Sequence, residues 1–168
     1  MSQAQPFLAD FHIHSHYSRA TTPQLTPENL DYWSRLKGLH VMGTGDCVHP
    51  GWLEELQAKL EPAGGGLFRL KPDYQLPAVS TTRLVDGTLR FLLTTEISSI
   101  YKKGGRVRKV HNICVLPDFD AATRFQARLR QIGNIASDGR PILGLDAKHL
   151  LEILLSIAPN AYLIPAHI

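Results

Sequence analysis

The sequence has few cysteines and no long apolar run. Its two cysteines, Cys47 and Cys114, are too few for a disulfide framework and do not form a Cys-x-x-Cys pair. No stretch approaches the roughly 20 apolar residues that cross a bilayer. Residues 1–5 lack the basic and apolar segments of a signal peptide. These absences argue against a secreted or membrane-inserted protein and favour a reducing, cytoplasmic location.

Neither sign of charge dominates the 168 residues, which carry 18 basic and 15 acidic side chains and a net charge of +3. The distribution of the basic residues is more informative than their number. Five of them flank Gly104-Gly105: Lys102, Lys103, Arg106, Arg108 and Lys109. A basic segment of this kind can follow a phosphate backbone. The alternative is a solvated hairpin whose positive charge has no partner.

Five short apolar runs each begin or end on a histidine or a carboxylate. Short apolar runs bounded by turn residues predict strands that are buried on both faces. Side chains at the carboxyl ends of such strands meet at one edge of a parallel sheet, where functional sites collect. A cluster of imidazoles and carboxylates there predicts a polynuclear metal centre. The runs are residues 7–14, 39–46, 91–96, 110–116 and 161–167.

Helical patterns separate these runs and predict an α/β fold with a mainly parallel sheet. Five strands make most of a barrel, but closure needs more, so we expect an incomplete, distorted (β/α) barrel with its metal site at the strand ends. The last strand leaves an exposed edge, and we interpret residues 1–168 as the N-terminal part of a larger protein. We expect helices at 27–37, 50–60, 121–132 and 147–157, an exposed connection at 61–74 and a hairpin at 84–93.

The candidate metal ligands follow from these positions. His12 and His14 are two residues apart at a strand end, so both imidazoles can project from the same face. Glu96 closes an apolar run without a basic neighbour and is suited to bridging two ions. His111 and His167 are predicted terminal ligands. Asp46 and His49 follow a Gly-Thr-Gly turn, and Asp46 acts either as a ligand or as the residue that orients one.

Three other histidines have alternative explanations. His16 shares the parity of His12 and His14 and could join them, but we favour a solvent-facing loop position for it. His40 opens a strand and His149 lies within a helical pattern, and we expect both to be structural.

Longer motifs resemble a known family. These motifs include Phe-His-Ile-His-Ser at 11–15, Gly-Thr-Gly-Asp at 43–46, His-Pro-Gly-Trp-Leu at 49–53, Thr-Glu-Ile-Ser-Ser at 95–99, and Ser-Asp-Gly-Arg-Pro at 137–141. Together with Val-His-Asn and Pro-Ala-His, these motifs resemble the PHP (polymerase and histidinol phosphatase) superfamily of metal-dependent phosphoesterases. Within that superfamily they are most similar to endonuclease Q and its bacterial relatives.

This resemblance implies a fold, a function and a ligand set. The fold is a PHP-type barrel, and the function is metal-dependent nicking of DNA on the 5′ side of a deaminated or damaged base during repair. Two or three divalent ions would be bound, with zinc preferred over manganese or magnesium. Glu96 and Asp46 would be catalytic. The implied metal ligands are His12, His14, Asp46, His49, Glu96, His111 and His167, and the implied DNA contacts are Lys102, Lys103, Arg106 and Arg108.

One family motif is absent from this sequence. No Asp-x-His pair follows the Pro-Ala-His segment, so the missing ligands would come from a C-terminal portion of the same protein. Two alternatives therefore stay open beside the endonuclease. One is a small-molecule phosphatase of the same superfamily, and the other is an inactive metal-binding or DNA-binding fragment.

Overall fold

The computed structural model describes residues 6–19, 21–77 and 89–167. Within these residues it contains four α-helices, one 3-10 turn and an eight-stranded sheet. The helices are α1 (Pro27–Leu36), α2 (Pro50–Lys59), α3 (Phe119–Arg130) and α4 (Ala147–Ile157), with the 3-10 turn η1 at Pro72–Tyr74. The strands are β1 (Ala9–Asp10), β2 (Val41–Gly43), β3 (Leu60–Gly64), β4 (Leu67–Leu70), β5 (Arg90–Lys103), β6 (Arg106–Leu116), β7 (Ile142–Leu143) and β8 (Tyr162–Ala166).

The four predicted helices are confirmed, and three of them begin at a side-chain cap. Thr26 accepts a hydrogen bond from the Asn29 amide at the start of α1, and Pro27 follows at the first helical position. Asp118 caps α3 through the Ala121 amide, and Asp146 caps α4 through the Lys148 amide. These caps satisfy amides that the helices cannot pair internally, and they place the helix starts close to where the sequence pattern indicated.

The prediction of a parallel sheet is wrong for β6. Strands β1, β2 and β5 are parallel neighbours, but β6 runs antiparallel to both β5 and β8. The reason is the connection between β5 and β6, which consists only of Gly104 and Gly105. A two-residue connection makes a hairpin, whereas a parallel crossover needs a dozen or more residues. The basic segment therefore belongs to a long hairpin. A hairpin is also the form assumed by the alternative to a DNA-binding segment.

A second correction concerns residues 61–74. They were expected to form an exposed connection, but they contain most of an antiparallel hairpin, β3 with β4, and β4 also pairs with β5. Phe68 and Leu70 are buried on either side of the exposed Arg69, which anchors the hairpin to the core. Half of the hairpin predicted at 84–93 falls on residues 84–88, which lie outside the described residues, and residues 90–93 begin β5.

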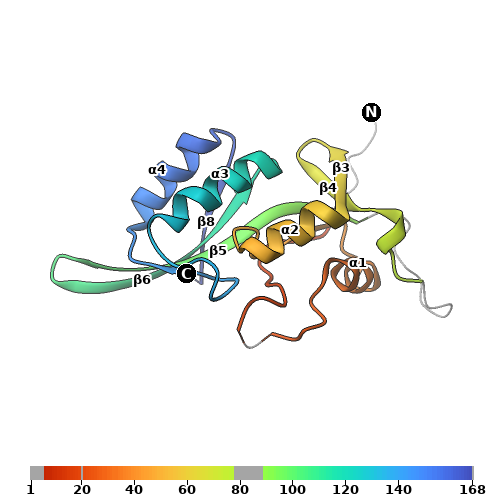
Figure 1. Cartoon of the computed structure of the whole chain (residues 1–168), viewed down its shortest axis with the longest axis horizontal. Coiled ribbons are helices and arrows are strands. Elements are labelled where there is room, and N and C mark those ends of the chain that lie inside the picture. Colours follow the sequence, from red (N-terminus) through yellow and green to blue (C-terminus); the bar gives the residue numbers. More distant parts are fainter. Residues whose placement is uncertain (1–5, 20, 78–88, 168) are drawn as a thin grey trace.

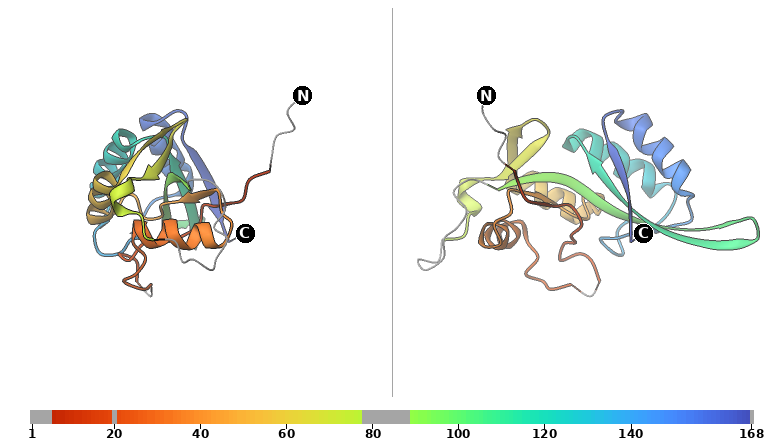
Figure 2. Two further views of the ribbon diagram at one scale, coloured as in Figure 1. Left: turned by 90° about the vertical axis from the view of Figure 1, so that its right-hand side faces the viewer. Right: turned by 180° about the vertical axis from the view of Figure 1, so that it is seen from behind.

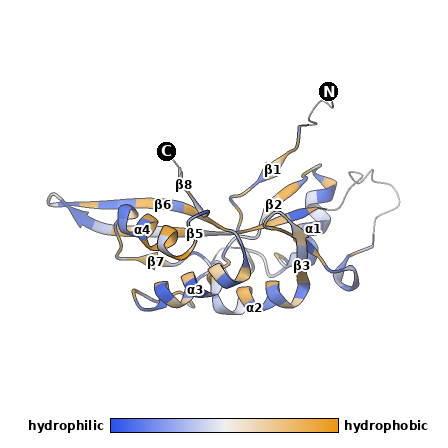
Figure 3. Ribbon diagram, turned by 90° about the horizontal axis from the view of Figure 1, so that it is seen from above, coloured by the Kyte–Doolittle hydropathy of each residue, from blue (hydrophilic) through white to orange (hydrophobic). Residues whose placement is uncertain are grey.

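The sheet is curled and covered mainly on one face, as in an incomplete barrel. Figure 3 shows α2 and α3 on one side of the sheet, and Figure 1 shows α4 beside α3. The core lies between these helices and the sheet. It includes Trp52 from α2, Phe91 and Leu116 from the strands, and Phe125 and Leu154 from the other two helices.

The expectation that the strands are buried on both faces holds for the middle of β5, where residues 93–99 are all buried, but it is wrong for β8. Phe91, Leu93 and Ile97 of β5 point toward the helices and are buried in the core, and we call this side the covered face. Residues between them point to the opposite side, which we call the open face. Tyr162 and Ile164 on β8 are 68% and 42% exposed.

Strands β1 and β8 are edge strands of the sheet. Among the described strands, β1 pairs only with β2, and β8 pairs only with β6. Figure 2 shows the sheet curling, so that it forms part of a barrel wall. None of the described helices has the length and apolar character needed to span a membrane.

Candidate metal centre

A single buried carboxylate, that of Glu96 on β5, lies at the centre of the site. Its side chain is fully buried, and three imidazoles surround it. His14 Nε2 lies 3.1 Å and His12 Nε2 lies 3.5 Å from Glu96 Oε2, while His111 Nδ1 lies 2.7 Å from Oε1. The first segment of the chain and β6 therefore contribute histidines to the two different oxygens of one carboxylate.

His167 is the fourth histidine of this cluster. It follows β8, and its ring centroid lies 4.9 Å from that of His12 and 5.1 Å from that of His111. Potential ligand atoms of His12, Glu96 and His167 all lie within 4.8 Å of one another. Because His12 follows β1 and His167 follows β8, two edge strands of the sheet bring histidines to this cluster.

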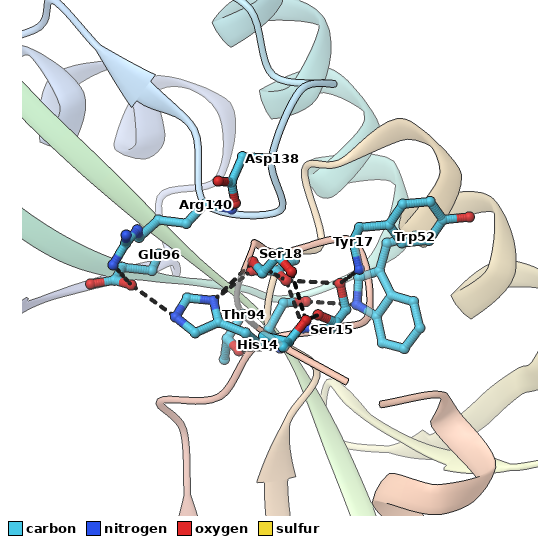
Figure 4. A network of polar contacts seen from close by, with 12 residues as sticks. His14, Ser15, Tyr17, Ser18, Trp52, Thr94, Glu96, Asp138 and Arg140 are labelled. Atoms are coloured by element: carbon cyan, nitrogen blue, oxygen red, sulfur yellow. Dashed lines mark hydrogen bonds and ion pairs between the residues drawn. The ribbon is translucent and has the colours of Figure 1, made fainter. Parts of the chain in front are cut away.

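Asp46 orients His14 from the opposite side of the imidazole. Asp46 Oδ1 lies 2.9 Å from His14 Nδ1, which leaves Nε2 directed at Glu96 (Figure 4). Its other oxygen accepts hydrogen bonds from the Ser15 amide, the Ser15 hydroxyl and the Ser18 hydroxyl at 2.6, 2.8 and 2.9 Å. A carboxylate that holds a histidine by its second nitrogen sets the tautomer and direction of a metal ligand.

The backbone near Asp46 is tightly constrained. Asp46 itself has a φ of 49°, and His167 has a φ of 56°, a left-handed conformation that non-glycine residues rarely adopt. A Cβ atom on Gly139 would overlap Asp46 Oδ2 and the Ser18 hydroxyl. The loop at 137–140 therefore packs its backbone directly against the carboxylate, and only glycine allows this approach.

The charges of the cluster reinforce one another. The hydrogen bond with Asp46, followed by the contact with Glu96, raises the pKa of His14 from 6.5 to about 9. Burial by itself would raise the pKa of Glu96, but the contact with His14 and the charges of His111 and His12 lower it from 4.5 to about 2. Glu96 is therefore an anion throughout the physiological range, and His14 of the metal-free protein holds a proton.

These residues fit a divalent metal centre. Glu96 Oε1, Glu96 Oε2 and His111 Nδ1 are buried and make no well-aligned hydrogen bond among the described residues. Buried charged oxygens without such partners are costly unless they coordinate a cation. Imidazole nitrogen and carboxylate oxygen are also the donors that zinc, manganese and iron accept in proteins.

The structure separates His49 and His16 from contact with Glu96. His49 immediately precedes α2. Its Nε2 donates a hydrogen bond to the Ala136 carbonyl at 3.1 Å, and its ring stacks on that of Tyr17. Burial lowers the pKa of His49. His16 Nε2 instead forms an ion pair with Glu55 at 2.8 Å. A ligand role for His49 stays a prediction, since its Nδ1 makes no hydrogen bond among the described residues.

The remaining histidines lie where a structural role was expected. His40 Nδ1 accepts a hydrogen bond from the Leu8 amide at 3.0 Å, next to β1 and β2. His149 is exposed on α4. Both cysteines are buried free thiols, and burial raises the pKa of Cys47 well above its ordinary value and that of Cys114 to about 12.

Three residues of the site were missed by the sequence analysis. Ser15 and Ser18 hold Asp46, and Arg140 places Nη1 3.6 Å from Glu96 Oε2. Ser15 belongs to the Phe-His-Ile-His-Ser motif, which could have identified it. Arg140 belongs to the Ser-Asp-Gly-Arg-Pro motif, but it is separated from Glu96 by 44 residues of chain, and no periodic pattern connects the two.

Comparison with known proteins places this geometry in a class. No protein-family model matches the chain. In structure, the chain is similar to lesion-specific endonucleases, with TM-scores of 0.74 and 0.73. It also shares 29% identity over 159 residues with an uncharacterized protein of Methanocaldococcus jannaschii, covering 94% of this chain and 16% of the relative.

Both of these solved structures are of endonuclease Q. The lesion-specific endonuclease PfuEndoQ from Pyrococcus furiosus is 29% identical, and the match covers 96% of this chain and 34% of that protein. An endonuclease Q bound to a 27-mer duplex with an abasic lesion at its active site is 30% identical, with 95% and 34% covered. The resemblance to endonuclease Q is therefore confirmed, and PHP-type architecture is consistent with it. The chain spans about a third of these solved proteins.

Proposed function

We propose that this chain carries metal-binding residues of a DNA endonuclease that nicks on the 5′ side of deaminated or damaged bases. The observation that carries the proposal is the convergence of His12, His14 and His111 on the buried carboxylate of Glu96, with His167 stacked on His12. The similarity to endonuclease Q over nearly the whole chain supports DNA as the substrate.

Five residues are suited to hold divalent cations: His12, His14, Glu96, His111 and His167. Glu96 presents one oxygen to His12 and His14 and the other to His111, so it is the residue suited to bridge two ions. Divalent cations bound there would polarise a phosphodiester and lower the pKa of water that attacks it. We expect zinc first. Manganese and magnesium are the alternatives, because the donor set accepts all three metals to different degrees.

The protein's own contribution is orientation and charge. Asp46 holds His14 in one tautomer and is itself held by Ser15 and Ser18, so the imidazole cannot turn away from Glu96. In the metal-free protein His14 keeps a proton between Asp46 and Glu96, and that proton must leave before the nitrogen can act as a ligand. Asp46 and Glu96 are thus the two carboxylates on which the chemistry depends.

One face of the basic hairpin supplies a surface for DNA. Its tip extends beyond the helices (Figure 1), and Lys102, Arg106 and Arg108 are exposed on it. Lys103 is also exposed, but its Nζ is paired with Asp146 at 2.9 Å. Side chains of this kind neutralise phosphates and make affinity depend on salt.

Metal analysis tests the first half of the proposal without requiring turnover. We expect the purified chain to bind zinc or manganese stoichiometrically, as measured by mass spectrometry of metals after dialysis and by isothermal titration. Glu96→Gln should abolish this binding. Binding that is unchanged in Glu96→Gln would contradict the assignment of the site.

A nicking assay tests the second half. A duplex with a single deoxyuridine or deoxyinosine and a labelled strand is incubated with the chain and zinc, manganese or magnesium. We expect one product that ends on the 5′ side of the altered base. Bound metal without nicking would favour a binding module, and release of phosphate from monoesters without nicking would favour a phosphatase.

A further inference from the structure

The basic residues of the hairpin divide between its two faces. Residues directly opposite each other in an antiparallel pair share a face, and neighbours along a strand alternate. The register pairs Ile100 with Lys109 and Lys102 with Val107. By this alternation Lys102 and Lys109 lie on the open face with Glu96 and His111. The other three cations, Lys103, Arg106 and Arg108, belong to the opposite side.

An ion pair supports this division. Lys103 Nζ lies 2.9 Å from Asp146 Oδ2, and Asp146 caps α4, one of the helices on the covered face. Lys109 is exposed and forms no ion pair among the described residues. Of the four DNA contacts predicted from sequence, only Lys102 therefore shares the face of the metal centre, and Lys109 joins it there.

Lys109 borders a cavity beside the histidine cluster. The cavity has a volume of about 270 Å³ and is lined by Lys109, Val110, His111, Ala166 and His167. His111 is the histidine that contacts Glu96 Oε1. The Lys109 cavity therefore lies on the Oε1 side of the central carboxylate.

A second, smaller cavity lies on the other side of this carboxylate. Its volume is about 70 Å³, and it is lined by His14, Ser18, Arg19, Asp138 and Arg140. His14 and Arg140 both approach Glu96 Oε2, at 3.1 and 3.6 Å. The guanidinium of Arg140 at its wall suits a small anionic group.

The loop that carries Arg140 is held in place by its backbone. Asp138 Oδ1 accepts hydrogen bonds from the Arg140 and Arg19 amides at 3.1 and 3.4 Å, and the Gly139 amide donates to the Tyr17 carbonyl at 3.1 Å. The Arg140 side chain is nevertheless 40% exposed. Figure 4 shows it directed from this loop toward Glu96, beside His14.

We propose that Lys109 and Arg140 bind phosphate groups of one DNA strand on opposite sides of the bond that is cut, whereas Arg106 and Arg108 do not contact that strand. This inference rests on the proposed endonuclease function and names the path of the substrate across the site. A guanidinium can bind a phosphate through two parallel N–H groups, and an ammonium neutralises one as a point charge. Each contact should release counterions and contribute to the salt dependence of binding.

The test compares matched charge removals on the two faces. Lys109→Gln and Arg140→Gln are compared with Arg106→Gln and Arg108→Gln, using fluorescence anisotropy of a labelled deoxyuridine duplex across a salt series with zinc present. Lys109→Gln and Arg140→Gln should each weaken binding roughly threefold to tenfold and reduce the salt slope by about one. The two control variants should change affinity less than about twofold.

Further variants and measurements separate the possible failures. Arg140→Lys should restore the salt slope but only part of the affinity, because an ammonium lacks the planar pair of donors. Metal content and the thermal midpoint should be unchanged in all variants. Equal losses on both faces, or no loss on either, would overturn the inference. If Lys109→Gln and Arg140→Gln alone weaken binding but the wild-type chain does not nick, the assignment of the DNA-binding face stands and the proposed nuclease activity fails.

Discussion

The covered and open faces of β5 and β6 place very different chemistry on the same two strands. On the covered face, Phe91, Leu93 and Leu116 are fully buried against the helices. On the open face, Glu96 and His111 belong to a cluster that also includes histidines that follow β1 and β8. A shift of one residue in register would exchange the two sets. Packing on the covered face therefore sets the position of the metal centre, and changes on either face should have separable effects.

The largest effect should come from the centre of the open face. Glu96→Gln removes the only carboxylate that His12, His14 and His111 share, so metal affinity should fall by at least about 100-fold and nicking should be lost. Isothermal titration measures the first and the duplex assay measures the second. The matched control is Ile97→Val, the next residue on the covered face, which should retain metal binding. A Glu96→Gln protein that keeps full metal affinity would contradict the comparison.

The second effect concerns the covered face. Leu93→Ala leaves a cavity beneath the sheet and should lower the free energy of unfolding by about 2–5 kcal/mol. Urea denaturation of the metal-free protein measures this change. The fraction that remains folded should still bind metal with the stoichiometry of the wild type, because Leu93 does not face the site. Loss of metal binding by the folded fraction would show that the two faces are not separable.

A smaller effect should follow when the orienting residue is changed. Asp46→Asn keeps the size of the side chain but removes the charge that holds His14 Nδ1 and accepts from Ser15 and Ser18. We expect a loss of about 10- to 100-fold in metal affinity, the usual range for such partners. Ser18→Ala removes one of the three donors to Asp46 and serves as a graded comparison, with a smaller loss. If Asp46→Asn binds metal as tightly as the wild type, the orienting role is wrong.

The smallest effect is on the stability of the metal-free protein as pH changes. The pKa of His14 is raised from 6.5 to about 9, so its stabilising contribution is complete below pH 6.5 and is lost as the pH rises through about 9. The pKa of Glu96 is lowered from 4.5 to about 2, so its contribution is complete above pH 4.5 and is lost as the pH falls through about 2.

Urea denaturation between pH 6 and pH 10, with a chelator present, tests the His14 contribution. We expect a loss on the order of 2 kcal/mol, after allowance for the partial exposure of the imidazole. His14→Gln should flatten this part of the profile. A wild-type profile that is already flat between pH 6 and pH 10 would show that His14 is not protonated between the two carboxylates.

Much of the site could be predicted from local sequence. The His-x-His pair, Glu96, His111 and His167 each stand at the edge of an apolar run, and an ionisable group in that position needs a partner. The alternation of β6 also contained the information that Lys109 shares a face with His111, two residues away, although the basic residues were first grouped without regard to face. Asp46 was expected either to bind a metal or to orient a ligand, and the structure shows it orienting His14.

Sequence by itself determined the helix starts and the donors of the site, because caps, apolar periodicity and ionisable groups act over a few residues. Only the tertiary structure decided the pairing of β8 with β6, the pairing of the segment at 61–74 with β5, and the approach of Arg140 to Glu96. These features depend on contacts between residues far apart in the chain. Such contacts form only when the whole sheet assembles, and no local pattern encodes them.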